Sequence, residues 1–311
     1  MTTGIGDDTA VMTVAPGAAL LATTDLVVED VHFRWSSASP RDIGWKAMAV
    51  NLSDIAAMGG VPRWALVGLA LPESARVEDV EGVYAGMREA ARPHNVLIVG
   101  GDTSMSPGGW VINVTLLGEH TGTPRLRSMA RAGDAVLVTG SLGRSAAGLA
   151  ALERGAASRI SRAALEEITT AHLRPRARVP EGAWLGAQAA VHALMDCSDG
   201  LATDLAHICR ESRVTARVFL DRLPVSAALG EAACALGGDV IQWATGGGED
   251  YELLLTCEPD AANALAEGLQ RATGSRLTVI GEIGSGPGAV SWIDAAGSAV
   301  AIRPGYEHFR G

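Results

Sequence analysis

Apolar residues fall into short runs that glycine-rich polar turns separate along the chain. Runs rich in Val, Ile, Leu and Thr predict strands, because these side chains suit a pleated and partly buried surface. The predicted strands are 19–24, 26–31, 64–71, 96–99, 110–118, 135–139, 191–195 and the end of 244–256. Helices are predicted at 46–60, 77–92 and 201–210, the second from its clear helical periodicity. This mixture is typical of an α+β protein.

Residues 46–60 are unusual because the predicted helix is apolar on nearly every side, yet it contains Asn51 and Asp54. A helix with no polar face should be buried. A buried carboxylate is costly unless it is hydrogen-bonded, paired or bound to a cation. A local cap or a core hydrogen bond would explain a single aspartate. Acids also lie beside glycines or strand ends in GIGDD, TTD, GGD, DCSDG and GGGED, so we interpret Asp54 as the centre of an acidic metal site.

The length of 311 residues suits two domains, and the polar, arginine-rich stretch 122–134 is a plausible linker. We therefore predict domains at 1–122 and 132–311. The net charge of −10 argues against nucleic acid or an anionic membrane as a partner. Lys46 is the only lysine, so a cationic contact to phosphate is expected from arginine.

The cysteines and the N-terminus bear on the compartment. Four cysteines show no CxxC spacing, so neither a zinc site nor a disulfide framework is expected. The first residues have no basic region and no apolar signal core, and no apolar run is long enough to span a membrane. A cytoplasmic protein is expected.

Many acidic segments with Ser and Thr neighbours match the oxygen ligands of Mg²⁺ better than those of zinc. The chain has no GxSxG motif, and 140–143 gives only GxxG, so we interpret that turn as structural, with phosphate binding as the alternative. Paired carboxylates for glycoside chemistry remain possible. Several acids, few cations and glycine loops together suggest ATP held through several Mg²⁺ ions, and hence phosphoryl transfer.

The order and spacing of the motifs resemble the thiamine-monophosphate kinase family over nearly the whole chain. These motifs are GIGDD, TTDLVVEDVHF, KAMAVNLSDIAAMGG, GGDTS, DCSDGLATDL and GGGEDYELLL. The resemblance implies a two-domain fold like that of aminoimidazole ribonucleotide synthetase. Its N-terminal domain would form a barrel across a homodimer, and an α/β domain would pack beside it. The implied activity is ATP-dependent phosphorylation of thiamine monophosphate, with Mg²⁺.

The resemblance also implies roles for individual residues. Asp54 and Asp25 would be catalytic. The implied magnesium ligands are Asp8, Thr23, Thr24, Asp25, Asp54, Asp102, Asp196 and Asp199. The implied ATP contacts are Gly101, Asp102, Arg127, Ser198 and Tyr84. The implied contacts to thiamine monophosphate are His32, Glu249 and Phe309, which suits a cationic thiazolium ring because cations favour carboxylates and aromatic faces.

Two alternatives stay open beside the kinase. One is another ATP-dependent synthetase of the same superfamily, although the reactive Cys and N-terminal Lys expected of selenophosphate synthetase are missing from this sequence. The other is a nucleotide-binding maturation scaffold without kinase turnover. The chain departs from the family pattern at Asp30, where a glycine is common, which adds negative charge beside His32.

Overall fold

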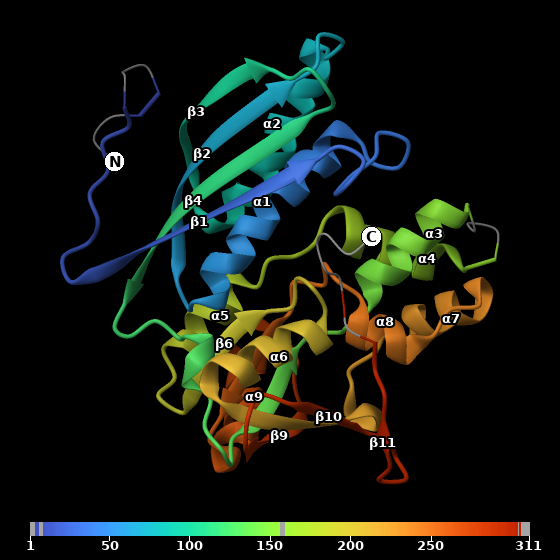
Figure 1. Ribbon diagram of the computed structural model, residues 1–311. Coiled ribbons are helices and arrows are strands. Elements are labelled where there is room, and N and C mark those ends of the chain that lie inside the picture. The colour runs from blue at the N-terminus through green and yellow to red at the C-terminus, as the bar shows by residue number, and fades with distance from the viewer. Residues whose placement is uncertain (1–3, 6–8, 156–158, 304, 306–311) are drawn as a thin grey trace.

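A computed structural model describes residues 4–5, 9–155, 159–303 and 305 of the chain. The proposed ligands Asp8 and Phe309 lie outside these residues. The chain builds two sheets, one from its first part and one from its second, with helices packed between and around them (Figure 1). No helix in the described part of the chain is long and apolar enough to cross a membrane.

The first sheet has four strands in the order β1-β4-β2-β3. Its strands are β1 (Ala18–Val28), β2 (Val61–Leu71), β3 (Leu97–Met105) and β4 (Val111–Thr121). β4 pairs antiparallel with β1 and β2, and β2 pairs parallel with β3. Two strands predicted at 19–24 and 26–31 prove to be one, because β1 runs straight through Asp25. β3 also extends past the predicted end at Val99, so Gly101 and Asp102 lie in a strand and not in a turn.

The second sheet has seven strands in the order β11-β10-β7-β9-β5-β8-β6. Its strands are β5 (Ala135–Thr139), β6 (Val191–Asp196), β7 (Val214–Phe219), β8 (Leu253–Cys257), β9 (Leu277–Ser285), β10 (Val290–Ile293) and β11 (Ala299–Val300). The helices of this part are α3 (Arg144–Arg154), α4 (Arg162–Leu173), α5 (Val179–Gly186), α6 (Leu201–Ser212), α7 (Ala227–Leu236), α8 (Val240–Gly246) and α9 (Ala262–Thr273). Short 3-10 turns are η1 (Arg92–His94), η2 (Arg127–Met129), η3 (Leu220–Arg222) and η4 (Pro259–Ala261).

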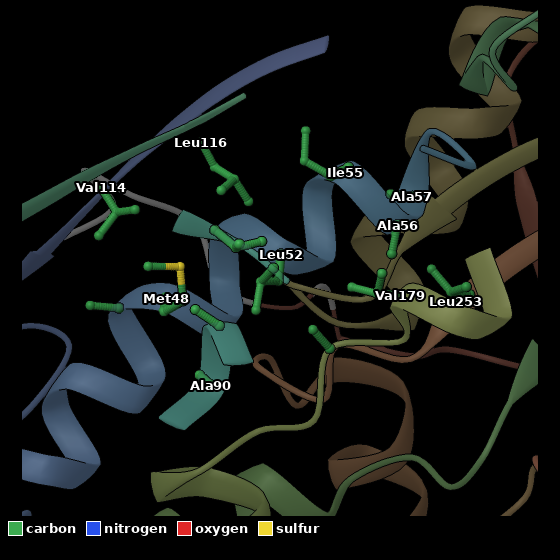
Figure 2. Packing of buried hydrophobic residues seen from close by; sticks show 14 of the residues in the cluster. Met48, Leu52, Ile55, Ala56, Ala57, Ala90, Val114, Leu116, Val179 and Leu253 are labelled. Carbon is green, nitrogen blue, oxygen red and sulfur yellow. The ribbon is translucent and has the colours of Figure 1, made fainter. Parts of the chain in front are cut away.

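Helix α1 (Pro40–Ala57) connects the two halves of the molecule. It begins earlier than predicted, because Ser39 and Asp42 form a capping box and Pro40 starts the first turn. Together with α2 (Val77–Ala91), α1 packs against the first sheet, and it also contacts α5 and β6 of the second half. The prediction that this helix is buried on nearly every side is confirmed. Figure 2 shows Met48 and Leu52 of α1 on the side of Val114, Leu116 and Ala90 of the first half, whereas Ala56 and Ala57 lie toward Val179 and Leu253 of the second.

Glycines let α1 approach its neighbours closely. A Cβ atom added at Gly44 would lie 1.8 Å from the carbonyl oxygen of Val83 in α2. One added at Gly182 in α5 would lie 2.2 Å from the carbonyl oxygen of Ala56. Backbone atoms cannot yield as a flexible side chain can, so any larger residue forces the helices apart. The position of α1, and therefore of the acids that it carries, depends on these two contacts.

We expect Gly44→Ala to lower the free energy of unfolding by about 2 kcal/mol or more, because overpacking against backbone is not relieved by a rotamer change. The control is Gly230→Ala in α7, where an added Cβ meets nothing within 4 Å. There the variant should be more stable by roughly 0.5–1 kcal/mol, since alanine favours a helix interior. Urea unfolding of both variants checks this. Equal stability of the two would show that the α1–α2 contact adjusts freely.

Candidate active site

A cleft of about 1080 Å³ opens between the two halves. Its walls come from the end of β1, the following loop, α1, α3 and α4, and the loops at 198–199 and 246–251. Of the residues predicted for the site, the cleft wall contains Asp25, His32, Ser198, Asp199 and Glu249. The structure therefore brings together residues from three of the predicted motifs.

An acidic centre lies where β1, α1 and β6 meet. Alternation along β1 places Thr23 and Asp25 on the face toward α1. The hydroxyl of Thr23 donates a hydrogen bond to Asp54 of α1. The hydroxyl of Ser53, the next residue, donates to Asp196 at the end of β6, at 2.5 Å. Two adjacent residues of one helix thus join carboxylates from both halves of the molecule.

The pKa values of these three carboxylates are all raised. Burial, and then the negative charge of Asp54, raises the pKa of Asp25 to about 7. The same two causes raise the pKa of Asp196 to about 7. Burial also raises the pKa of Asp54, against the hydrogen bond from Thr23 and the charge of Arg127. Arg127 is the linker arginine predicted to contact ATP, and its charge reaches this centre. The carboxylates hold more negative charge than the protein neutralises.

The donor set suits a hard cation such as Mg²⁺, which prefers carboxylate, hydroxyl and amide oxygens. Besides the acids, Asn51 is fully buried, and its Oδ1 has no hydrogen-bond partner among the residues that the structure describes. No group of three or more His, Cys, Asp or Glu side chains in the described ranges is arranged to hold a metal ion alone.

Backbone hydrogen bonds join the two loops of the cleft wall that contain Ser198 and Glu249. The amide of Glu249 donates to the carbonyl of Ser198 at 2.7 Å, and that of Tyr251 donates to Cys197 at 2.9 Å. An added Cβ at Gly248 would lie 2.8 Å from the Ser198 oxygen, so glycine is needed for this approach. Glu249 and Tyr251 both have positive φ, at 63° and 51°. Backbone strain of this kind is commonly found at ligand sites. Here the two backbone hydrogen bonds hold Glu249 in this conformation beside Ser198 and Asp199.

Glu249 takes part in an ion cluster that the sequence did not reveal. Lys46 Nζ of α1 lies 3.0 Å from Glu249 Oε2, and His172 Nδ1 of α4 lies 3.2 Å from the same oxygen. Burial opposes ionisation, but Lys46 and then His172 outweigh it and hold the pKa of Glu249 at about 2. A lone lysine inside an apolar helix was the available signal for Lys46. His172 had none, because its contact depends on the tertiary fold.

The turn before α3 does not present a phosphate cradle. Asp250 accepts hydrogen bonds there from the amides of Gly143 and Ser145, the donors that a phosphate would use. Burial raises the pKa of Asp250 to about 7, against those two bonds. A side chain of the protein thus fills the start of α3, in line with the interpretation of this turn as structural.

Some predicted residues do not reach the acidic centre within one chain. Gly101 and Asp102 lie on β3, at the opposite edge of the first sheet from β1. Three strand spacings of about 4.8 Å separate the two edges by about 14 Å. Thr24 points to the sheet face away from Thr23, where its hydroxyl contacts Thr115. The convergence of the GGD segment on Asp54 therefore stays a prediction.

Tyr84 lies on α2 and packs against the hydrophobic core, away from the residues of the cleft wall. Its role in binding ATP stays a prediction. Asp30 has a φ of 63°, in the left-handed region that glycine favours, which gives a physical reason for the glycine common at this position.

The chain matches known sequence families in both halves. The AIR synthase related protein N-terminal domain matches residues 6–120, and the corresponding C-terminal domain matches residues 131–294. The chain is 40% identical over 251 residues to thiamine-monophosphate kinase of Bacillus subtilis (strain 168), covering 80% of this chain and 76% of that protein. It is 38% identical over 309 residues to thiamine-monophosphate kinase of Aquifex aeolicus (strain VF5), covering 98% and 92%. The structure of AaThiL complexed with AMPPCP and TMP matches with a TM-score of 0.83 and 35% identity, covering 96% of this chain and 89% of that one.

We expect the metal-free protein to lose stability as the pH rises from about 4 to about 7. In this window Asp25 and Asp196 keep their protons in the folded state, whereas the unfolded chain, with a carboxyl pKa of 3.8, has released them. The folded state thus binds more protons, so raising the pH favours unfolding. Asp25→Asn should remove roughly 1–2 kcal/mol of this dependence, less than the full shift because solvent screens part of it. Urea unfolding at pH 5 and pH 7.5 without divalent ions measures it, and parallel pH dependences of the variant and the wild type would contradict it.

Proposed function

This chain belongs to the thiamine-monophosphate kinase family of AIR synthase related proteins, and we propose that it transfers the γ-phosphoryl group of ATP to thiamine monophosphate. The observation that carries the proposal is a cleft whose wall contains both Asp25 of the acidic centre and Glu249, whose pKa is lowered to about 2 by Lys46 and His172 against burial. The relative AaThiL, solved with the ATP analogue AMPPCP and with TMP, supports the choice of both substrates.

Helix α1 sets the spacing between the two ends. Lys46, Val50 and Asp54 are four residues apart in turn, so they lie along one side of the helix. Eight residues at 1.5 Å each put Lys46 and Asp54 about 12 Å apart. Lys46 contacts Glu249, whereas Asp54 is part of the acidic centre and accepts a hydrogen bond from Thr23. We place the cationic thiazolium end of the substrate at Glu249 and His32, and its phosphate toward Asp54.

The acidic centre fits magnesium through Asp25, Asp54, Asp196 and Asp199, with Asp8 as a further proposed ligand. Bound Mg²⁺ would neutralise the phosphate charge that the carboxylates alone would repel. Thr23 and Ser53 hold two of these carboxylates in fixed orientations through hydrogen bonds. Arg127 is available to the nucleotide, since its charge already reaches Asp54. The phosphate of thiamine monophosphate is ionised at neutral pH, so the transfer needs no strong general base.

We also propose a homodimer formed by the first sheet. Helices α1 and α2 cover one face of this sheet, whereas Leu20 and Leu66 on the other face are 53% and 36% exposed. Asp102 and Thr24 share that outer face with Leu66 according to the strand register. A second copy packed there would cover the apolar side chains. It would also bring Asp102 of one copy toward a site from which it is distant within its own chain.

We propose a reducing compartment, the cytoplasm, because all four cysteines are free and Cys234 is exposed.

The proposed reaction is tested by incubating the purified protein with ATP, Mg²⁺ and thiamine monophosphate and following the product by mass spectrometry. We expect a product heavier by one phosphoryl group. Asp54→Asn should lower turnover by roughly a hundredfold or more, the scale for losing one strong electrostatic contact. Its free energy of unfolding should not fall, because the change removes a buried charge and keeps the shape. No phosphorylated product from the wild type would reject the kinase and favour a nucleotide-binding scaffold.

We expect Leu20→Glu to shift the protein from dimer to monomer, because it places a charge in the proposed apolar interface. The control is Val225→Glu, a change at a side chain that is 42% exposed and lies in the other half of the molecule. Light scattering at micromolar concentration distinguishes the two states. A wild-type monomer, or a Leu20→Glu variant that stays dimeric, would show that this sheet face is not the interface.

A further inference from the structure

Glu249 is held by two basic side chains that come from different halves of the molecule. Lys46 belongs to α1, and its side chain is only 4% exposed. His172 belongs to α4, and its side chain is 9% exposed. The Lys46 ammonium also lies 3.4 Å from the carbonyl oxygen of His32, and Ser145 Oγ lies 3.1 Å from His172 Nδ1. We propose that Lys46 and His172 are positioning residues that fix the Glu249 carboxylate for the cationic end of thiamine monophosphate.

The geometry of the cluster supports this division of roles. Both basic groups contact Oε2 of Glu249. Oε1 makes no ion pair or hydrogen bond with the described part of the chain, and Glu249 keeps 26% of its side chain exposed in the cleft wall. One oxygen is therefore anchored to the protein, and the other is available to a ligand. A carboxylate fixed in this way loses little rotamer entropy when a ligand binds.

The charges explain why an anchor is needed. Without Lys46, burial would disfavour the ionised form of Glu249, and a neutral acid attracts a cation weakly. Lys46 is itself largely buried, and it gains a partner in Glu249 and a carbonyl acceptor in His32. The left-handed backbone of Glu249 restricts its direction further, because φ of 63° is costly for any residue but glycine. Side-chain contacts and backbone thus fix the same carboxylate.

The inference rests on thiamine monophosphate being the substrate, which wild-type turnover establishes separately. The test is a double-mutant cycle of Lys46→Met and Glu249→Gln, with KM for each substrate and kcat measured for all four proteins. We expect each single variant to raise KM for thiamine monophosphate roughly tenfold, as for a lost charge-assisted contact. The double variant should be little worse than either single one. KM for ATP should stay within about twofold.

Two outcomes would overturn the inference while the kinase activity stands. Multiplicative effects, giving roughly a hundredfold rise in the double variant, would show that Lys46 acts independently of Glu249. A matched rise in KM for ATP, or a fall in kcat alone, would assign Lys46 to the nucleotide or to the reaction. Arg217→Met, which breaks an exposed ion pair with Glu282, is the control for losing a cation and should leave both KM values unchanged.

A second pair of variants decides the matter if Lys46→Met does not fold. His172→Asn keeps a nitrogen near the position of Nδ1, whereas His172→Leu removes it. We expect His172→Leu to raise KM for thiamine monophosphate about fivefold or more, and His172→Asn to restore most of the loss. Equal KM values for the two variants would show that His172 serves packing only and would reject its role as a positioning residue. Circular dichroism confirms that each variant is folded.

Discussion

The burial of Asp25, Asp54 and Asp196 at one point is the constraint on which the site depends. Moving a carboxylate out of water is costly, and three in proximity repel one another. The fold supplies hydroxyl donors from Thr23 and Ser53, and the charge of Arg127 lowers the pKa of Asp54, yet burial still raises the pKa values of Asp25 and Asp196 to about 7. This uncompensated charge opposes folding slightly and favours a divalent cation strongly. The same carboxylates therefore lower the stability of the metal-free protein and provide the ligands for a divalent cation.

Helix α1 lets the chain hold that charge in place. A helix packed against the first sheet on one side and against α5 and β6 on another can only be apolar nearly all round. At Gly44 and Gly182 the backbones are so close that an added methyl group would clash with them, and this packing fixes the position of the helix. Because Lys46 and Asp54 lie on one side of this helix, the same packing sets both ends of the cleft.

The sequence predicted the parts of the site that depend on local pattern. Asp25, Asp199 and Glu249, which were expected from acids at strand ends and beside glycines, line the cleft. Asp54, the acid inside the apolar helix, lies next to them and accepts a hydrogen bond from Thr23. Contacts that depend on tertiary packing were not predictable, and His172 beside Glu249 is the clearest case. Two ligands implied by the family resemblance are separated from the others by the sheet. Alternation along β1 sends Thr24 to the opposite face from Thr23 and Asp25, and sheet order puts Asp102 at the far edge, so their roles stay predictions.

The pKa values of the carboxylates are shifted in opposite directions at the two ends of the cleft. At one end burial, and then the negative charge of Asp54, raises the pKa values of Asp25 and Asp196 to about 7. At the other end Lys46 and His172 hold the pKa of Glu249 at about 2. A divalent cation gains most where the negative charge is uncompensated. Beside Glu249, Lys46 repels such an ion, while the second carboxylate oxygen can still accept a contact from a large, weakly hydrated organic cation. With the proposed sites, the charge of one lysine would direct metal and substrate to different ends of the cleft.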